Sequence, residues 1–114
     1  MSVPYSQIEV ALIMAFMVIG DSEDLTEGTT KVFNVDERNI AVCKVDGQLY
    51  AIDDICSHDL APLNQGYLDG FEIECPRHGA RFDVRTGDVT ELPARLPIDC
   101  FKVRVVDGQI EVDI

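Results

Sequence analysis

The sequence is poor in basic residues: 9 lysines and arginines stand against 21 aspartates and glutamates, which gives a net charge of −12. Proteins that bind nucleic acids carry basic patches, so this balance argues against a nucleic-acid partner. The same charge would attract a basic protein surface, although solubility alone is an ordinary reason for acidic residues. The acidic composition therefore argues against nucleic-acid binding, and it is explained either by docking to a basic protein or by solubility.

Long hydrophobic segments are also absent. The most apolar run, residues 10–19, is shorter than the roughly 20 apolar residues that span a bilayer. It lacks the preceding positive charges and the following small-residue cleavage site of a secretory signal. We therefore expect no membrane association and a cytoplasmic location.

Groups for hydrolytic or phosphoryl chemistry are scarce as well. The chain has 2 histidines and no glycine-rich phosphate-binding loop. Asp53 and Asp54 are adjacent carboxylates, but such pairs at the start of a loop usually serve structure or solvation. The 114 residues suffice for one domain and leave no room for a separate catalytic domain. We therefore expect that the protein is not an enzyme by itself.

What the sequence does contain is a series of short β-strand patterns without helical periodicity. The expected strands are residues 16–19, 31–34, 40–45, 48–53, 66–68, 71–74, 81–83, 100–106 and 109–113. Asp-Gly pairs at 46–47, 69–70 and 107–108 lie between β-prone flanks and are typical of tight hairpin turns. Many short strands at regular turn spacing indicate an all-β protein, an antiparallel sandwich or barrel.

Both histidines lie in one compact motif. Cys56 and His58 form a C-x-H pair, and after sixteen intervening residues Cys75 and His78 form a C-x2-H pair. Two Cys and two His suit a Rieske [2Fe-2S] cluster, in which the Cys hold one iron and the His hold the other. They also suit a tetrahedral zinc ion, but zinc motifs usually place two to four residues between the ligands of a pair. The motif therefore predicts a metal centre and favours the cluster over zinc.

At these loops the sequence resembles the soluble, bacterial-type Rieske ferredoxins. The second loop, residues 75–83, reads CPRHGARFD, and the likeness extends from about residue 16 to the C-terminus. Residues 50–55 lead into the first loop, and residues 61–63 followed by Gly66 leave it, in the family manner. The resemblance implies a Rieske fold: an antiparallel sandwich or barrel base with a small cluster-binding subdomain at about residues 55–89.

The resemblance also implies the cofactor and its ligands. We expect one [2Fe-2S] cluster of the Rieske type, bound through its metal ions by Cys56, His58, Cys75 and His78. In the family, the histidine edges face solvent at the tip of the two loops. With both histidines engaged in this way, no Ser-His-Asp catalytic set can be assembled.

The function that the resemblance implies is one-electron transfer. Such ferredoxins accept an electron from a flavin-dependent NAD(P)H reductase and deliver it to a terminal oxygenase, as components of aromatic ring-hydroxylating dioxygenase systems in aromatic hydrocarbon catabolism. One alternative is a small Rieske-like subunit of a nitrite reductase, although members of that group often lack the ligands that this chain keeps. A zinc-bound interaction module is the second alternative.

Two hydroxyl donors of high-potential Rieske proteins are missing. Those relatives carry Ser and Tyr two and four residues after the second histidine, where this chain has Ala80 and Phe82. They also carry an extra Cys in each loop, where this chain has Ala61 and Arg77. Without hydroxyl donors more negative charge stays on the sulfurs, so we expect a potential near the low end of the range of roughly −150 to +300 mV.

The remaining features concern the chain ends, the other cysteines and the rim of the site. We expect residues 1–13 to be a leader or upstream extension and residues 14–114 to form the ferredoxin domain. Cys43 and Cys100 lie in strand-like runs and are expected to be small buried residues without a mutual disulfide. The proline-rich residues 91–97 either pack beside the cluster or only connect back to the base. Candidates for the rim are Ser57, Asp59, Leu60, Pro62, Arg77, Gly79 and Pro93, with Asp59 and Arg77 equally well explained as solvated loop charges.

Overall fold

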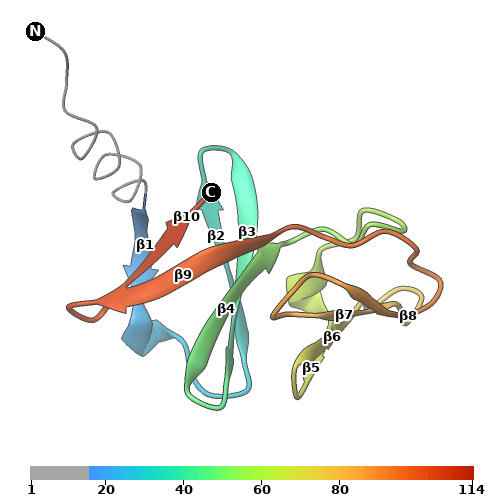
Figure 1. The fold of residues 1–114 in the computed structure, drawn as a ribbon, viewed down its shortest axis with the longest axis horizontal. Coiled ribbons are helices and arrows are strands. Elements are labelled where there is room, and N and C mark those ends of the chain that lie inside the picture. The colour runs from blue at the N-terminus through green and yellow to red at the C-terminus, as the bar shows by residue number, and fades with distance from the viewer. Residues whose placement is uncertain (1–15) are drawn as a thin grey trace, which may run out of the picture.

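Two antiparallel β-sheets make up the protein, in agreement with the expected all-β class (Figure 1). The structure is a computed structural model that describes residues 16–114, so the expected leader lies outside the described part. The larger sheet has six strands in the order β1-β10-β9-β4-β3-β2, and the smaller has four in the order β5-β6-β7-β8. The strands of the larger sheet are β1 (Met17–Asp21), β2 (Thr30–Val35), β3 (Arg38–Val45), β4 (Gln48–Asp53), β9 (Cys100–Val106) and β10 (Gln109–Asp113). Those of the smaller sheet are β5 (Tyr67–Asp69), β6 (Glu72–Glu74), β7 (Arg81–Asp83) and β8 (Val89–Glu91).

The larger sheet curls towards a barrel. Its two edge strands, β1 and β2, approach where Gly20 lies against Phe33: a Cβ atom at Gly20 would be 2.5 Å from the Phe33 ring. This curled sheet encloses the barrel core, which consists of Leu25, Val35, Ile40, Val42, Ala51, Ile110 and Val112. Burying these side chains is the main source of stability for this part of the protein.

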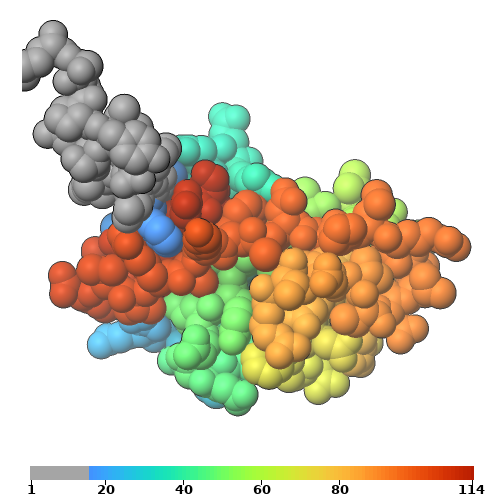
Figure 2. Space-filling model, viewed as in Figure 1, coloured from blue at the N-terminus to red at the C-terminus, as the bar shows by residue number. Residues whose placement is uncertain are grey.

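A second core joins the two sheets. This inter-sheet core consists of Ala41, Cys43, Ile52, Cys56, Ala61, Leu63, Ile73, Cys75, Ala80, Phe82, Val84, Ala94 and Ile98. Side chains alternate along β3, so Ile40 and Val42 belong to the barrel core while Ala41 and Cys43 belong to the inter-sheet core. Figure 2 shows the smaller sheet, yellow to orange, packed directly against the larger one. The large sheet therefore serves as a rigid base for the small one.

The expected strands all occur, several with the same bounds and the others shifted by one or two residues. The sequence patterns missed β8, a three-residue edge strand that pairs only with β7. They also missed two short 3₁₀ helices, η1 (Ser22–Asp24) and η2 (Leu63–Gln65). In residues 16–114, no helix is long and apolar enough to cross a membrane.

The hairpin turns show where the Asp-Gly rule holds and where it does not. The pairs at 46–47 and 107–108 have positive φ at both residues, as a type I′ turn requires. The third pair was placed one residue too early, because Asp69 ends β5 and the turn residues are Gly70 and Phe71. A further turn of the same kind joins β2 to β3 without glycine, through Asp36 and Glu37 at φ 50° and 67°.

Candidate metal centre

Two loops with matching backbone geometry carry the Cys-x-His motif. The first follows β4 and begins at Cys56, and the second follows β6 and begins at Cys75. In each loop the N–H of the cysteine donates to the carbonyl of the alanine five residues later, at 2.8 Å for Ala61 and 2.7 Å for Ala80. These hydrogen bonds close both loops at their base, one after a strand of the large sheet and the other after a strand of the small sheet.

The residue four positions after each cysteine reverses the chain. Gly79 has a φ of 75° and donates its N–H to the Cys75 carbonyl at 3.3 Å, which fits the expected role of this glycine in the turn. In the first loop Leu60 takes the same place, with a φ of 62° and a 2.8 Å hydrogen bond to the Cys56 carbonyl. A leucine in this region is strained, and its side chain is left pointing into solvent.

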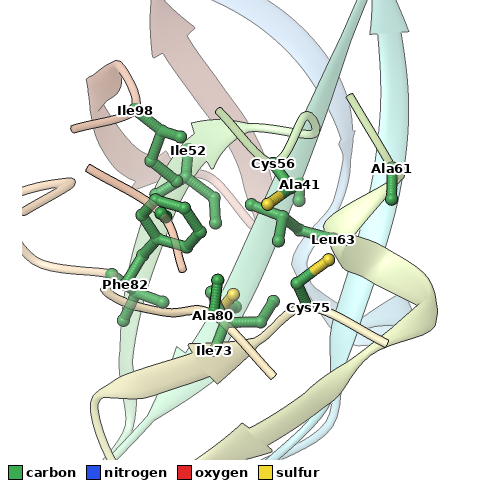
Figure 3. Close-up of a cluster of buried hydrophobic side chains, with 13 residues drawn as sticks. Ala41, Ile52, Cys56, Ala61, Leu63, Ile73, Cys75, Ala80, Phe82 and Ile98 are labelled. Atoms are coloured by element: carbon green, nitrogen blue, oxygen red, sulfur yellow. The ribbon is translucent and has the colours of Figure 1, made fainter. Parts of the chain in front are cut away.

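The two thiols lie inside the protein and the two imidazoles lie at its surface. Cys56 and Cys75 are 0% and 1% exposed, whereas His58 and His78 are both exposed. The imidazole rings are 5.3 Å apart between centroids and meet edge to face at 81°. Figure 3 shows both cysteines in the inter-sheet core, in the same cluster as Leu63, Ala80 and Phe82. The structure therefore places the two cysteines together in the core and the two imidazoles together at the surface, although the ligand atoms that lie within 4.8 Å of one another belong to Cys56, Asp59 and Cys75 and to neither histidine.

Burial sets the protonation of the first thiol. Loss of solvent raises the pKa of Cys56 to about 11, an effect that hydrogen bonds from the backbone of His58 and Asp59 only partly offset. The Cys56 thiol is therefore protonated at neutral pH in the absence of a metal. Because a thiolate is the form that binds metals, metal binding must release this proton.

Asp59 lies inside the site, which corrects the expectation of a rim residue or solvated loop charge. Its side chain is 13% exposed, and its Oδ1 accepts hydrogen bonds from the Ala61 N–H at 3.1 Å and the Cys75 thiol at 3.8 Å. Its Oδ2 is 3.5 Å from His78 Nε2 and is buried without a hydrogen bond. The ligand atoms of Cys56, Asp59 and Cys75 lie within 4.8 Å of one another.

The pKa of the Asp59 carboxyl is lowered. Burial acts to raise it, but the hydrogen bond from the Ala61 backbone, together with the nearby Cys56 thiol, His78 and Arg77, outweighs that effect. A buried anionic oxygen without a hydrogen bond is normally stabilised by a cation. The donor set and this oxygen together fit a positively charged metal group between the two loops.

A proline-rich segment covers one side of the site. Ser57 Oγ donates to the Leu96 carbonyl at 2.6 Å and ties the first loop to this segment. The segment runs beside the loop that follows β4, at the right-hand end of Figure 1. A groove of about 410 Å³ lies between them, lined by Ser57, His58, Leu92, Pro93, Arg95 and Leu96. Of the two alternatives for residues 91–97, the structure thus favours packing beside the site.

The acidic pair before the first loop has a structural role, as expected. Asp54 is 3% exposed and accepts hydrogen bonds from the backbone N–H and side-chain amide of Asn64, the former at 2.7 Å. Asp53 pairs with Arg38 at 3.2 Å, and the same guanidinium pairs with Asp99 at 2.8 Å. These contacts tie the end of β4 to η2 through Asn64 and to the start of β3 through Arg38, and so fix the position from which the first loop departs.

The surroundings of the cysteine sulfurs lack hydroxyl donors. Ala80 and Phe82 are fully buried, and no hydroxyl group within residues 16–114 donates a hydrogen bond to Cys56 or Cys75. The Ser57 hydroxyl, which is the nearest in sequence, is already bonded to the Leu96 carbonyl. Backbone hydrogen bonds from His58 and Asp59 therefore reach the Cys56 sulfur without an additional hydroxyl donor.

The two other cysteines differ from each other. Cys43 is buried in the inter-sheet core as expected, and burial raises its pKa to about 11. Cys100 was expected to be buried too, and that was wrong, because it lies on the outward face of β9 with Lys102 and Arg104. Both thiols are free.

Comparison with known proteins identifies the class. The Rieske [2Fe-2S] domain model matches residues 15–102. The chain is 36% identical over 91 residues to the ferredoxin component of a naphthalene 1,2-dioxygenase system of Pseudomonas putida, covering 80% of this chain and 88% of that one. It is 39% identical over 101 residues to the ferredoxin component of biphenyl 2,3-dioxygenase of Rhodococcus jostii (strain RHA1), covering 89% and 94%.

A solved structure gives the same result for the fold. A chain in the complex of reduced oxygenase and oxidized ferredoxin in carbazole 1,9a-dioxygenase superimposes with a TM-score of 0.81 at 37% identity, covering 87% of this chain and 93% of that one. The chain belongs to the Rieske [2Fe-2S] domain family. Its likeness to ferredoxin components over at least 80% of the chain confirms the expected electron carrier, which is not itself a catalytic enzyme.

Proposed function

We propose that Cys56 and Cys75 hold one iron of a [2Fe-2S] cluster and that His58 and His78 hold the other. The observation that carries this proposal is the separation of donor types: both thiols are buried, while both imidazoles are exposed and 5.3 Å apart. When bound, such a cluster accepts and releases one electron. The buried Asp59 Oδ2, which has no hydrogen bond, supports the presence of a cationic group at this place.

The exposed imidazoles provide the route for the electron. Thiolates stabilise ferric iron more than neutral imidazoles do, so the iron on the histidine side should be the one reduced. The His78 side chain is 54% exposed, so a partner that contacts the imidazoles would approach an iron held by them. The fold thus treats the two kinds of ligand differently: the inter-sheet core shields the thiolates from water, and the ends of the two loops expose the imidazoles to a partner.

We also assign a low potential to this carrier. The support is the absence of hydroxyl donors to Cys56 and Cys75 in the described residues, with Ala80 and Phe82 filling the positions of the donors in high-potential relatives. Loss of these hydrogen bonds disfavours the extra negative charge of the reduced state. The expected potential lies at the low end of the Rieske range, about −150 mV.

The proposed partners follow from the relatives. Those proteins are ferredoxin components of naphthalene and biphenyl dioxygenases, and one related ferredoxin was solved in complex with its oxygenase. We propose that this chain receives electrons from a flavoprotein NAD(P)H reductase and passes them to the terminal oxygenase of an aromatic ring-hydroxylating system. The free thiols of Cys43 and Cys100 fit a reducing cytoplasmic location.

Low-temperature EPR of the purified protein tests the proposal, together with iron, acid-labile sulfide and zinc analysis. We expect two irons and two sulfides per chain and a rhombic signal that appears only after reduction with dithionite. A protein that contains stoichiometric zinc and gives no signal would refute the electron-transfer role. His58→Ala and His78→Ala should each abolish or convert the signal, and an unchanged signal in either variant would remove that residue from the ligand set.

A further inference from the structure

The tip of the protein differs in charge from the rest of the chain. We define the tip as residues 55–61, 75–79 and 92–97, the segments that surround the two imidazoles. It contains one of the 21 acidic residues of the chain, Asp59, whose side chain is only 13% exposed. It also contains Arg77 and Arg95, both exposed. The surface that surrounds the imidazoles is therefore locally basic, although the whole chain carries a net charge of −12.

Most basic side chains elsewhere are neutralised by ion pairs. Carboxylates pair with Lys31, Arg38, Arg81, Arg85 and Arg104. Within residues 16–114, no ion pair forms to Lys44, Arg77, Arg95 or Lys102. Of these four, Lys44 and Lys102 lie on the large sheet, and the other two lie on the tip. Arg77 and Arg95 thus keep their charge available for another molecule.

The same tip exposes apolar side chains. Leu60, Leu92 and Leu96 are 73%, 64% and 67% exposed, and the last two line the groove beside His58. Leu60 is held outward by its positive φ in the closed first loop. A protein-binding surface usually has exposed apolar residues at its centre and charged residues at its edge.

We propose that the tip is a docking surface for an electron-accepting partner whose contact face is apolar at its centre and rimmed by carboxylates. The leucines contact the apolar centre, and Arg77 and Arg95 pair with the carboxylates. This inference rests on the proposed electron-carrier function and adds the chemistry of the partner's surface. The net charge of the chain alone would select a partner with a basic face, whereas the tip selects a partner with an acidic one.

Small redox probes test the local charge without the partner protein. The protein is reduced with dithionite and desalted, and its oxidation by the anion hexacyanoferrate(III) is followed by stopped flow at increasing ionic strength. A locally basic tip predicts that the rate falls as ionic strength rises, although the protein and the probe both carry net negative charge. If the net charge governs the encounter, the rate will rise with ionic strength, and that result would overturn the proposal.

Two matched double variants locate the effect. Arg77→Gln with Arg95→Gln should slow oxidation by hexacyanoferrate(III) about tenfold at low ionic strength, since both charges lie close to the exposed imidazoles. Lys44→Gln with Lys102→Gln removes the same charge from the large sheet and should change the rate less than about twofold. With the cationic acceptor hexaammineruthenium(III), the arginine variant should instead react faster than the wild type. Equal effects of the two double variants would refute a docking role for the tip arginines.

The result is distinguishable from failure of the proposed function. Each variant is first examined by EPR, and its midpoint potential is measured. A missing EPR signal in the wild-type protein refutes the electron-carrier proposal, whatever the tip charge. An intact signal with a rate that is insensitive to Arg77 and Arg95 refutes only the docking surface.

Discussion

Adding hydroxyl donors near the cysteine sulfurs should raise the reduction potential. Ala80 and Phe82 are both fully buried in the inter-sheet core, next to the loop of Cys75. The double variant Ala80→Ser with Phe82→Tyr adds one hydroxyl at each position with little change in side-chain volume. Each hydroxyl that donates to a cluster or cysteine sulfur stabilises the reduced state more than the oxidised state, because reduction increases the negative charge on sulfur.

The size of the shift follows from the strength of such hydrogen bonds. A hydrogen bond to a charged group contributes about 1.5–3 kcal/mol, and since reduction adds only part of a charge to each sulfur, we take about 1 kcal/mol as the difference between the two states. For a one-electron couple a factor of ten corresponds to about 59 mV, so each hydroxyl should raise the potential by about 40 mV and the pair by about 80 mV.

A potentiometric titration monitored by EPR measures this shift. Phe33→Tyr is the matched control, because it adds the same hydroxyl to a partly buried ring that packs on the barrel core, away from the metal centre. Its potential should equal that of the wild type. An intact cluster with no upward shift in the double variant would refute the hydrogen-bond explanation of the low potential.

Three further predictions concern the scaffold and the free thiols. Gly66→Ala should lower the free energy of unfolding by about 2 kcal/mol or more, because a Cβ atom would lie 1.8 Å from the Glu74 carbonyl oxygen; unchanged thermal stability would contradict this. Glu27→Gln should lower the thermal midpoint at neutral pH, because the Glu27 carboxylate accepts two backbone N–H groups of the β3–β4 turn at 2.8 Å, which lowers its pKa below 4.5. A lowered pKa of a carboxyl stabilises the folded state at pH values above the pKa of the unfolded chain. The difference in thermal midpoint between the wild type and Glu27→Gln should therefore shrink as the pH falls through 4.5 and below. A difference that persists in acid would argue against ionisation of Glu27 as its source. Iodoacetamide should alkylate the exposed Cys100 and spare the buried Cys43 in the native protein, and modification of both at equal rates, read by mass spectrometry, would contradict the assigned burial.

Local sequence patterns predicted the large sheet well because its strands are rich in β-prone residues and its turns carry strong signals. The strands at 48–53 and 100–106 were predicted with their observed bounds. β8 was missed, since three residues at a sheet edge carry too little periodicity and only their pairing with β7 makes them a strand. The turn through Asp36 and Glu37 was missed because it uses two non-glycine residues at positive φ.

The candidate site shows a similar division. The strand pattern before each pair was enough to predict that Cys56, His58, Cys75 and His78 lie on two loops, and the resemblance to Rieske ferredoxins implied that the two loops are neighbours. The sequence could not show that the Asp59 side chain turns inward between those loops. A loop residue next to His58 can point either into the protein or into solvent, and only the folded loop decides which. Composition also reports only the net charge, so the local excess of arginine at the tip became visible only in three dimensions.

In the proposed site, two imidazoles and two thiolates bind the cluster. Electron-nuclear double resonance on the reduced protein, prepared with ¹⁵N-labelled histidine, tests this ligand set most directly. We expect nitrogen couplings from two histidines, one of which is lost in a His58→Cys variant and the other in a His78→Cys variant. A reduced cluster without any histidine nitrogen coupling would contradict the assigned ligands.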